Sequence, residues 1–445
     1  MSKEKNILFL GIGGAGMTPL AQYYLSQGWK VLGYDRVLSP NVAMLQAKGV
    51  EVVVDDQLRW FPLFEEASQV VYTAAIATDH KVLQSFRDRS CSVLKRAEVL
   101  GHISKSHKTI GVAGTHGKTT TSAILTNILN EGDGVLSFVG GNLRNFESNF
   151  IFSGDEFMVA EADEFDRSLL HLDPYFSVLT NLEADHLDIY KDEKDLEETL
   201  LKFQRSAKHA LVHESLPADF ASSALVYGEG DSADYQLSEY VVKERHVALT
   251  FKKRGEQWLS CEWAVPGKYN ALNALASAAV ASEIGLSDDV IARGISGFKG
   301  VKRRFEIQHW GKKVLIDDYA HHPGEITAFL KGVHGMFPGK KVLGIFQPHL
   351  YSRTRDFLGG FADSLSALSE VWVLPIYEAR ELPIPGVSSE VLVEKIGQRA
   401  RLVEKRHLKD EFIRSINEFD VFLTIGAGDI SAFLEILNQA LNEFE

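Results

Sequence analysis

Cysteine is scarce in this sequence: only Cys91 and Cys261 occur, far apart and without the spacing of metal ligands. This argues against a disulfide framework or a cysteine-based zinc site, and a reduced, cytoplasmic compartment is expected. Long apolar runs are also missing, because no stretch reaches the roughly 18 residues of a membrane span. The apolar run near the N-terminus leads into a glycine turn instead of a cleavage site, which indicates a first β-strand and no signal peptide.

Basic stretches are missing as well. The formal net charge is −13, and no long run of lysine and arginine occurs, whereas a nucleic-acid-binding protein would carry a basic patch. The length of 445 residues suggests about two to four domains, and a hydrophobic content of 45% can fill sizeable cores. We therefore expect a multidomain protein that binds neither nucleic acid nor a membrane.

A glycine turn stands near the start of the chain. Gly11, Gly13 and Gly16 satisfy G-x-G-x-x-G, and Asp35 follows where a ribose-binding acid is expected. The motif alone predicts either a nucleotide ligand or a tight turn without one. Residues 73–76 follow a later strand, at the sheet edge that faces a ligand. The turn is flanked by a predicted strand, helix and second strand, at residues 6–10, 17–26 and 30–34.

A second glycine-rich loop, GVAGTHGKTTT, ends in Gly-Lys-Thr as a phosphate-binding loop does. The common pattern would place a glycine at position 112, where this chain has Val112. The loop still joins a strand to a helix N-terminus, where free N–H groups and the helix dipole favour phosphate. Lys118 adds a charge and Thr119 a hydroxyl suited to Mg²⁺. The predicted strand and helix cover residues 109–113 and 118–129.

Two acidic clusters follow predicted strands at residues 157–160 and 177–180. Carboxylates at the ends of parallel strands beside a phosphate loop suit Mg²⁺, although each cluster alone is also compatible with a solvated loop. Zinc is disfavoured because His186 has no cysteine or histidine at ligand spacing. The polar residues of the clusters are Glu161, Asp163, Glu164 and Asp166, then Asn181, Glu183, Asp185, His186 and Asp188.

The C-terminal part alternates strands and helices, which predicts a second open α/β sheet. Before it, a helix beginning near Tyr269 carries Asn270 and Asn273 on one face, either as ligand contacts or as surface polarity. The histidine pair after the first C-terminal strand is either a turn or a functional site. The polar residues in this part, including the histidine pair His321 and His322, are Lys302, Arg303, Arg304, Asp317, Asp318, His321, His322, His349, Arg353 and Arg355.

Together these motifs resemble the Mur ligases, ATP-dependent amide-forming enzymes of peptidoglycan precursor synthesis. The resemblance runs nearly end to end, and within the family the chain looks most like the branch that joins L-alanine to UDP-N-acetylmuramate. A sister branch, which re-attaches a recycled tripeptide to the same nucleotide, shares several of the strings. Besides GTHGKTTT and GIGGAGM, the strings are EADEFDRSLLHLDP, TNLEADHLDIY, GVKRRFE, DDYAHHPGEI, FQPHLYSRTRDF and GAGDI.

The resemblance implies a three-domain α/β architecture: a Rossmann-like UDP-binding domain (1–104), a central P-loop ATPase-like domain (105–300) and a C-terminal Rossmann-like domain that binds the amino acid (301–445). It implies catalytic roles for Lys118, Glu161 and His186, and Mg²⁺ ligation by Thr119, Glu161 and His186. The implied ATP-binding residues are Gly114, Thr115, His116, Gly117, Lys118, Thr119, Thr120, Asn270, Asn273, Arg304 and Asp318.

The same resemblance implies where the other two substrates bind. His349 and Arg353 would face the amino acid. Some relatives carry a carbamylated lysine where this chain has Leu200 and Leu201, and the adjacent Lys202 is not assigned that role. The implied UDP-sugar-binding residues are Gly13, Gly14, Ala15, Gly16, Met17, Asp35, Thr73, Ala74, Ala75 and His322.

The implied reaction has two steps. The lactyl carboxylate of UDP-N-acetylmuramate attacks the γ-phosphorus of ATP, and the amine of L-alanine then attacks the resulting acyl phosphate. Such chemistry needs positioning and charge neutralisation more than a protein nucleophile. ATP contacts on two domains imply closure before chemistry, which shields the acyl phosphate from water. The implied cofactors are ATP and Mg²⁺, and the state is monomer or homodimer.

Two rival functions use only part of these motifs. A nicotinamide-dependent dehydrogenase would explain the N-terminal glycine turn but not the second phosphate loop or the acidic clusters. A nucleotide-dependent switch would explain the phosphate loop but not the sugar-nucleotide and C-terminal strings. Phosphate release that requires both a UDP-sugar and an amino acid separates a ligase from both rivals.

Overall fold

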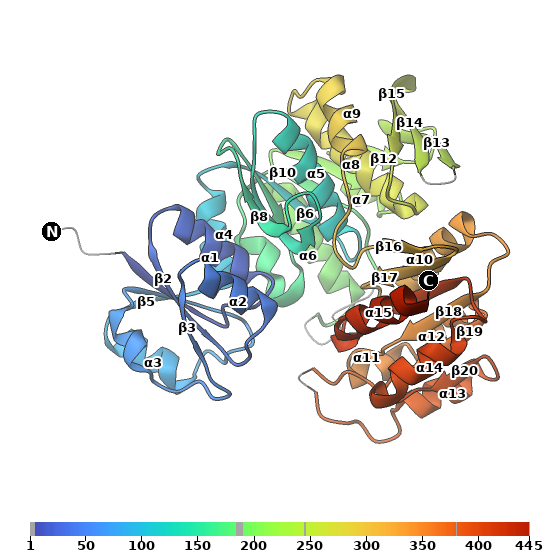
Figure 1. Ribbon diagram of the computed structural model, residues 1–445. Coiled ribbons are helices and arrows are strands. Elements are labelled where there is room, and N and C mark those ends of the chain that lie inside the picture. Colours follow the sequence, from blue (N-terminus) through green and yellow to red (C-terminus); the bar gives the residue numbers. More distant parts are fainter. Residues whose placement is uncertain (1–4, 184–189, 244–245, 380, 445) are drawn as a thin grey trace. The chain divides into compact units, whose positions relative to one another are not determined.

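The structure, a computed structural model, describes residues 5–183, 190–243, 246–379 and 381–444 (Figure 1). Its described strands form three sheets, of five, ten and six strands. The chain divides into two compact units. The first unit comprises residues 1–238, 250–261 and 272–298, and the second comprises 239–249, 262–271 and 299–445.

The N-terminal sheet is parallel and has the order β3-β2-β1-β4-β5, as in the first five strands of a Rossmann fold. The predicted first strand and first helix are confirmed, and the second strand extends one residue further to include Asp35. The strands are β1 Asn6–Leu10, β2 Lys30–Asp35, β3 Glu51–Val54, β4 Gln69–Tyr72 and β5 Ser92–Lys95. The helices are α1 Met17–Ser26, α2 Pro40–Ala47, η1 Pro62–Glu66, α3 Lys81–Asp88 and α4 Arg96–Ser104.

The ten-stranded sheet has β6 between β9 and β10, and both neighbours run parallel to it. The carboxyl ends of these three strands therefore meet at one edge, which is where the phosphate loop leaves β6. The sequence did not predict the antiparallel hairpin of β7 and β8 beside β9. The strands are β6 Lys108–Ala113, β7 Leu136–Leu143, β8 Ser148–Phe152, β9 Phe157–Glu161, β10 Pro174–Leu179, β11 His209–His213, β12 Leu225–Gly228, β13 Tyr235–Val242, β14 Val247–Lys253 and β15 Glu256–Trp263.

The helices that accompany this sheet include the one that begins at the phosphate loop. It starts at Lys118, as predicted, and continues two residues beyond the predicted end. The polar stretch 101–108, which spans the predicted domain boundary at 104/105, contains the last turn of α4 and the first residue of β6. The helices are α5 Lys118–Glu131, η2 Phe165–His171, α6 Glu193–Ser206, α7 Ala218–Ala221, α8 Lys268–Glu283 and α9 Asp288–Ser296.

The third sheet confirms the predicted second open α/β sheet. Its order is β16-β17-β21-β18-β19-β20, with only β16 antiparallel to its neighbour. The strands are β16 Glu306–Trp310, β17 Lys313–Asp318, β18 Val342–Phe346, β19 Glu370–Val373, β20 Ala400–Leu402 and β21 Val421–Ile425. The helices are α10 Pro323–Met336, α11 Tyr351–Asp356, α12 Leu358–Leu365, α13 Ser389–Ile396, η3 Lys405–His407, α14 Leu408–Ser415, η4 Asp429–Phe433 and α15 Leu434–Phe444.

Both faces of the third sheet are buried. Successive residues of a strand point to opposite faces, and Ile316 and Leu423 belong to one hydrophobic cluster while Leu315 and Phe422 belong to the other. This double burial explains why the strands are uninterrupted apolar runs in the sequence. A helix able to span a membrane is not found in the part of the chain that the structure describes.

A glycine in α4 tests how tightly the first unit is packed. A Cβ atom on Gly101 would collide with the carbonyl oxygen of His171. We expect Gly101→Ala to lower the free energy of unfolding by about 1–3 kcal/mol, because the backbone of η2 must move. Gly335→Ala in α10, where a Cβ atom meets nothing within 4 Å, should raise it by up to about 1 kcal/mol. The midpoints of urea unfolding measure the stability of the two variants and of the wild type. Equal midpoints for Gly101→Ala and the wild type would contradict the packing argument.

Candidate functional site

The loop between β6 and α5 requires two of its glycines. Gly114 and Gly117 have backbone φ angles of +120° and +85°, which residues with a side chain rarely adopt. A Cβ atom on Gly114 would collide with the Thr180 hydroxyl, and one on Gly117 would lie 2.7 Å from the carboxamide oxygen of Asn273. Val112 is a buried residue of β6. The glycine spacing is unusual because the turn begins only after this strand has ended.

Lys118 folds back over the loop that it terminates. Its Nζ donates hydrogen bonds to the carbonyl oxygen of Gly114 at 2.7 Å and to Oε1 of Glu164 at 2.9 Å. Burial lowers the pKa of Lys118, but the neighbouring carboxylates, that of Glu164 foremost, outweigh burial and raise the pKa above its ordinary value. The loop therefore holds a protonated lysine beside a buried carboxylate.

Thr119 and Glu161 place oxygen atoms together at the start of α5 and the end of β9. The Thr119 hydroxyl lies 3.0 Å from each carboxylate oxygen of Glu161, and the backbone N–H of Gly140 donates to Oε2 at 2.8 Å. A Cβ atom on Gly140 would lie 2.5 Å from that oxygen, so the approach depends on glycine. A hydroxyl and a carboxylate fit the oxygen preference of Mg²⁺. Thr120 is buried in the first turn of α5.

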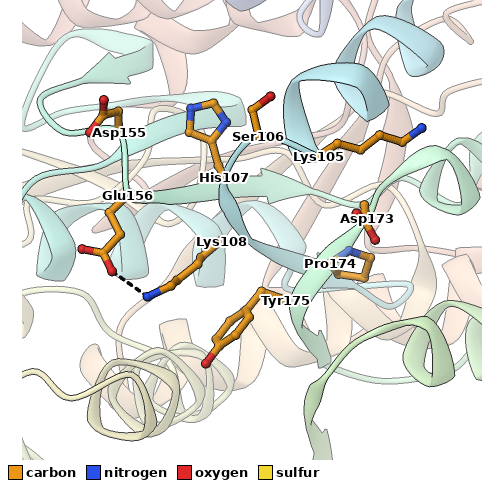
Figure 2. A pocket seen from close by; sticks show the side chains of 9 residues that line it. All are labelled: Lys105, Ser106, His107, Lys108, Asp155, Glu156, Asp173, Pro174 and Tyr175. Carbon is orange, nitrogen blue, oxygen red and sulfur yellow. Dashed lines mark hydrogen bonds and ion pairs between the residues drawn. The ribbon is translucent and has the colours of Figure 1, made fainter.

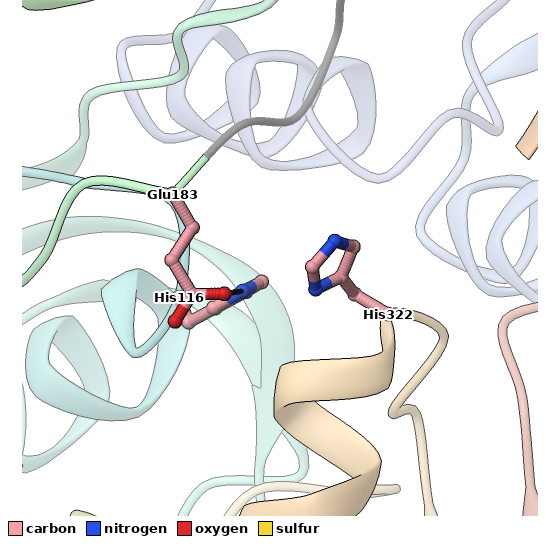
Figure 3. A group of neighbouring side chains, drawn as sticks. All are labelled: His116, Glu183 and His322. Atoms are coloured by element: carbon pink, nitrogen blue, oxygen red, sulfur yellow. Dashed lines mark hydrogen bonds and ion pairs between the residues drawn. The ribbon is translucent and has the colours of Figure 1, made fainter. Parts of the chain in front are cut away.

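The segment after β10 supports the same loop from its other side. The hydroxyl of Thr115 donates to the carbonyl oxygen of Glu183 at 3.0 Å, and the N–H of Glu183 donates back at 2.9 Å. The N–H of His116 donates to Asn181, whose Nδ2 returns a bond to the carbonyl oxygen of His116. The His116 ring lies 3.2 Å from the Glu183 carboxylate (Figure 3). Asp185, His186 and Asp188 lie outside the described residues.

The two asparagines of α8 have different surroundings, although the sequence places them on one face. Asn273 lies against Gly117 of the phosphate loop. Asn270 donates from Nδ2 to the carbonyl oxygen of Pro266 at 2.7 Å, and its buried Oδ1 has no hydrogen-bond partner among the described residues. A buried amide oxygen without a partner is costly, so this atom is suited to accept a hydrogen bond from a ligand.

The N-terminal glycine turn is fastened by the predicted ribose-binding acid. Oδ2 of Asp35 accepts a hydrogen bond from the N–H of Gly13 at 2.8 Å, and Oδ1 accepts from the N–H of Arg36 at 2.8 Å. A Cβ atom on Gly13 would meet the Ser39 hydroxyl at 2.8 Å, while Gly14 and Ala15 are exposed. Asp35 therefore shapes the turn in addition to any role toward a ligand.

The loop after β4 lies at the same sheet edge as this turn. The side chain of Thr73 approaches Gly11, where a Cβ atom would lie 2.7 Å from Cγ2 of Thr73. Ala74 and Ala75 follow as exposed residues, and Met17 is buried at the first position of α1. The structure thus brings the predicted UDP-sugar-binding residues of this domain to one edge.

In the second unit, Asp318 ends β17 in a buried position. Its Oδ2 accepts a hydrogen bond from the N–H of Phe305 at 2.7 Å, and its Oδ1 accepts from the N–H of Ala320 at 2.8 Å. Burial raises the pKa of Asp318 to about 7, against the opposing effect of Arg304. Arg303 instead pairs with Asp317 at 3.3 Å. Arg304 acts on Asp318 through its charge, and its own ion pair, at 3.9 Å, is with Glu325.

The predicted histidines lie at the start of α10 and after β18. His322 directly precedes α10 (Figure 3). It caps this helix, with Nδ1 3.3 Å from the backbone nitrogen of Gly324. The rings of His321 and His349 lie 6.2 Å apart, and His349 stacks on Tyr377 at 5.6 Å. Arg353, in α11, is buried. These side chains occupy the carboxyl edge of the third sheet, as the sequence predicted.

Several residues of these sites were missed by the sequence reasoning. Glu164 and Asn181 were noted only as members of acidic clusters, yet they hold the loop lysine and the loop backbone. Gly140 comes from the unpredicted hairpin, and Arg96 reaches the N-terminal turn from α4. The glycine in the string VGGN offered a signal for the first of these, but no pattern pointed to Arg96.

A surface pocket lies elsewhere in the first unit, at the amino ends of β6 and β10 (Figure 2). It has a volume of about 490 Å³ and mixes both signs of charge, with Lys108 paired to Glu156 at 2.7 Å. The phosphate loop leaves the opposite end of β6, so this pocket is separate from the site described above.

Comparison with known proteins covers the whole chain. Residues 6–108 match the Mur ligase family catalytic domain, residues 112–281 the Mur ligase middle domain, and residues 303–428 the Mur ligase glutamate ligase domain. The UDP-N-acetylmuramate–L-alanine ligase of Christiangramia forsetii is 41% identical, over 98% of each chain. That of Flavobacterium johnsoniae is 39% identical, over 100% of this chain and 99% of the relative.

Two solved structures share the fold. The UDP-N-acetylmuramate–alanine ligase MurC of Thermotoga maritima matches with a TM-score of 0.81 and 25% identity, over 99% of each chain. A murein peptide ligase of Psychrobacter arcticus matches with a TM-score of 0.68 and 22% identity, over 98% of each chain. The three-domain α/β architecture expected from the sequence is therefore confirmed, whereas the boundaries at 104/105 and 300/301 stay predictions.

The raised pKa of Asp318 predicts a dependence of stability on pH. Between about pH 4 and 7 the folded state keeps a proton that the unfolded state has lost, so this group's contribution to the free energy of unfolding falls as pH rises. Asp318→Asn cannot titrate, and the wild-type advantage over this variant should shrink by up to about 4 kcal/mol across that range.

Urea unfolding at about pH 5 and about pH 8 measures the difference. Asp420→Asn is the matched control: the N–H of Lys341 lowers the pKa of Asp420, so this carboxyl is ionised in the folded and the unfolded protein at both pH values, and the difference between wild type and this variant should not change. A wild-type advantage over Asp318→Asn that does not change with pH would contradict the assignment.

Proposed function

Because the chain belongs to the Mur ligase family, we propose that it is an ATP-dependent ligase that joins L-alanine to the lactyl carboxylate of UDP-N-acetylmuramate in peptidoglycan precursor synthesis. One observation carries the proposal. Relatives bearing the name UDP-N-acetylmuramate–L-alanine ligase are 36% to 41% identical over 97% or more of this chain. The scarcity of cysteine supports a cytoplasmic location for this enzyme.

The reaction requires two bond-forming steps. The lactyl carboxylate attacks the γ-phosphorus of ATP, which gives an acyl phosphate and ADP. The amine of L-alanine then attacks the acyl carbon, and inorganic phosphate leaves. Phosphoryl transfer of this kind is accelerated by positioning and by electrostatic stabilisation, which the phosphate loop and its lysine can supply.

Lys118 and the loop amides hold the ATP phosphates in this proposal. The support is electrostatic: Lys118 is a protonated cation at a helix N-terminus, and its partner in the structure is the carboxylate of Glu164. A phosphate oxygen can replace that carboxylate without leaving the lysine unpaired. Asn273 beside the loop, and Asn270 with its unpartnered oxygen, complete the contacts on α8.

Mg²⁺ would be held by Thr119 and Glu161, whose oxygen atoms converge and fit this ion, and by His186 on the strength of the resemblance alone. When bound, the ion neutralises charge on the phosphates. Arg304 and Asp318 are proposed to contact ATP from the second unit. His349 and Arg353 are proposed to hold the L-alanine carboxylate, which an arginine can bind with two parallel hydrogen bonds.

The sugar nucleotide binds at the N-terminal turn in this proposal. The support is the shared sheet edge of the glycine turn, the Asp35 carboxylate and the loop after β4. The dehydrogenase alternative leaves Lys118 and Glu161 without a role, and the switch alternative leaves this turn without one. The tripeptide-recycling branch shares the fold, because this chain matches a solved murein peptide ligase with 22% identity.

The experiment is phosphate release from ATP with UDP-N-acetylmuramate and L-alanine, supplied together and separately. Release should require both substrates, and product mass should show the alanine adduct. Glycine and L-serine should be poor substitutes, because one methyl or hydroxyl group in an apolar pocket discriminates by only about 1–3 kcal/mol. A dominant adduct with the Ala-Glu-diaminopimelate tripeptide would move the chain to the recycling branch, and release without either substrate would favour a switch.

Lys118→Ala should remove ATP turnover, because a charged phosphate contact is worth about 1.5–3 kcal/mol or more. The variant should still fold, but with a lower free energy of unfolding, because the buried carboxylate of Glu164 loses this lysine. Lys108→Ala is the matched control: Lys108 also pairs with a carboxylate but lies at the other end of β6 (Figure 2). Phosphate release measures turnover, and circular dichroism measures folding. Near-normal turnover in Lys118→Ala would contradict the proposed role.

Glu161→Ala and His186→Ala should each raise the Mg²⁺ concentration needed for half-maximal activity and lower the maximal rate, because each removes a ligand. Glu156→Ala, just before the other end of β9, is the matched control and should leave the Mg²⁺ titration unchanged. If the titration of Glu161→Ala overlays that of the wild type, or if zinc supports activity best, the metal assignment is wrong.

A further inference from the structure

Arg96 lies against the N-terminal glycine turn, although it comes from a different helix. It is the first residue of α4, directly after β5, so it lies at the carboxyl edge of the five-stranded sheet together with the turn. A Cβ atom on Gly16 would lie 2.9 Å from both Cδ and Nη1 of Arg96. Gly16 thus leaves room for a guanidinium, not only for close packing of helix on strand.

The ion pair that holds Arg96 is a loose one. Nη2 of Arg96 lies 3.7 Å from Oδ2 of Asp163, beyond the range of a hydrogen bond, and the Asp163 side chain is 39% exposed. Lys95, the preceding residue, pairs with Asp166 at 2.9 Å. Lys95 and Arg96 therefore contact the same acidic segment in different ways. Lys95 forms a hydrogen bond, whereas the contact of Arg96 is long enough for a phosphate to replace Asp163.

The turn beside Arg96 favours an anion. Helix α1 begins at Met17 after Gly16, and among its described residues no side chain caps this end and no acidic residue occupies the first turn. Gly14 and Ala15, just before it, are exposed, while the carbonyl oxygen of Ala15 accepts a hydrogen bond from Asn149 at 3.0 Å. A helix N-terminus attracts negative charge, and a guanidinium presents two parallel donors to a phosphate.

We propose that Arg96 binds the diphosphate of the sugar nucleotide at this turn and exchanges Asp163 for it. The inference rests on the proposed function, because it takes a nucleoside diphosphate as the ligand. The exchange also connects this turn to the phosphate loop, because Asp163 lies in the sequence between Glu161 and Glu164. Glu161 contacts Thr119, and Glu164 contacts Lys118. Loss of the Arg96 contact changes the charge environment of the loop that holds the ATP-binding lysine.

Equilibrium binding of UDP alone, followed by calorimetry, tests the role without catalysis. Arg96→Ala should weaken UDP binding by about 10- to 100-fold, as expected for charge-assisted hydrogen bonds, and Arg96→Lys should restore part of the loss. ADP binding should change far less than UDP binding in both variants, because Arg96 acts on the phosphate loop only through the charge of Asp163. Lys95→Ala is the matched control, because it breaks the neighbouring ion pair without touching Gly16, and its UDP affinity should stay near that of wild type.

Asp163→Asn gives an independent readout if Arg96→Ala does not fold. Removal of the competing carboxylate should tighten UDP binding, and the gain should vanish when Arg96 is also replaced. Unchanged or weaker UDP binding in Asp163→Asn, or wild-type affinity in a folded Arg96→Ala, would overturn the inference and leave the proposed function standing. A wild-type protein that does not bind UDP would overturn both.

Discussion

The buried ion pair of Lys118 and Glu164 is the interaction on which the central site depends. Their side chains are only 12% and 4% exposed, so water solvates neither charge well, and each charge is compensated mainly by the other. Breaking such a pair by removing one partner costs about 3–5 kcal/mol, because the remaining charge stays buried. Glu164 thus fixes Nζ of Lys118 over the loop, where it also donates to the carbonyl oxygen of Gly114.

The acidic segment that carries Glu164 is fixed on several sides. The hydroxyl of Tyr190 donates to the carbonyl oxygen of Glu164 at 2.7 Å. Asp166 and Arg167 adopt left-handed backbone conformations, and Arg167 pairs with Asp195 of α6 at 2.6 Å. Non-glycine residues in this region are strained by about 1–3 kcal/mol and persist where their surroundings determine them. The segment is therefore held so that its carboxylates contact Lys118 of the loop, Lys95 at the end of β5 and Arg96 at the start of α4.

The sequence predicted those parts of the fold and site that follow from local rules. β1 and α1 were placed correctly, because a buried parallel strand, a glycine turn and an amphipathic helix leave clear patterns. Glu161 was placed beside the loop because parallel strand ends meet at one edge. Gly140 and Arg96 were missed because their roles depend on which distant backbone lies nearby. The carbonyl oxygen of Pro266, which receives the Asn270 hydrogen bond, likewise has no local signature.

Three glycines, one in each glycine-rich loop and one in β7, show why such partners escape a sequence pattern. A Cβ atom on Gly117 would meet the Asn273 carboxamide, one on Gly140 the Glu161 carboxylate, and one on Gly16 the Arg96 guanidinium. In each case the space left by the missing side chain is filled by a polar group from another element. The pattern records the glycine, but the chemistry belongs to the residue opposite it. Alanine at any of the three would displace that polar group by a fraction of an ångström or more, and such groups act only when held in place.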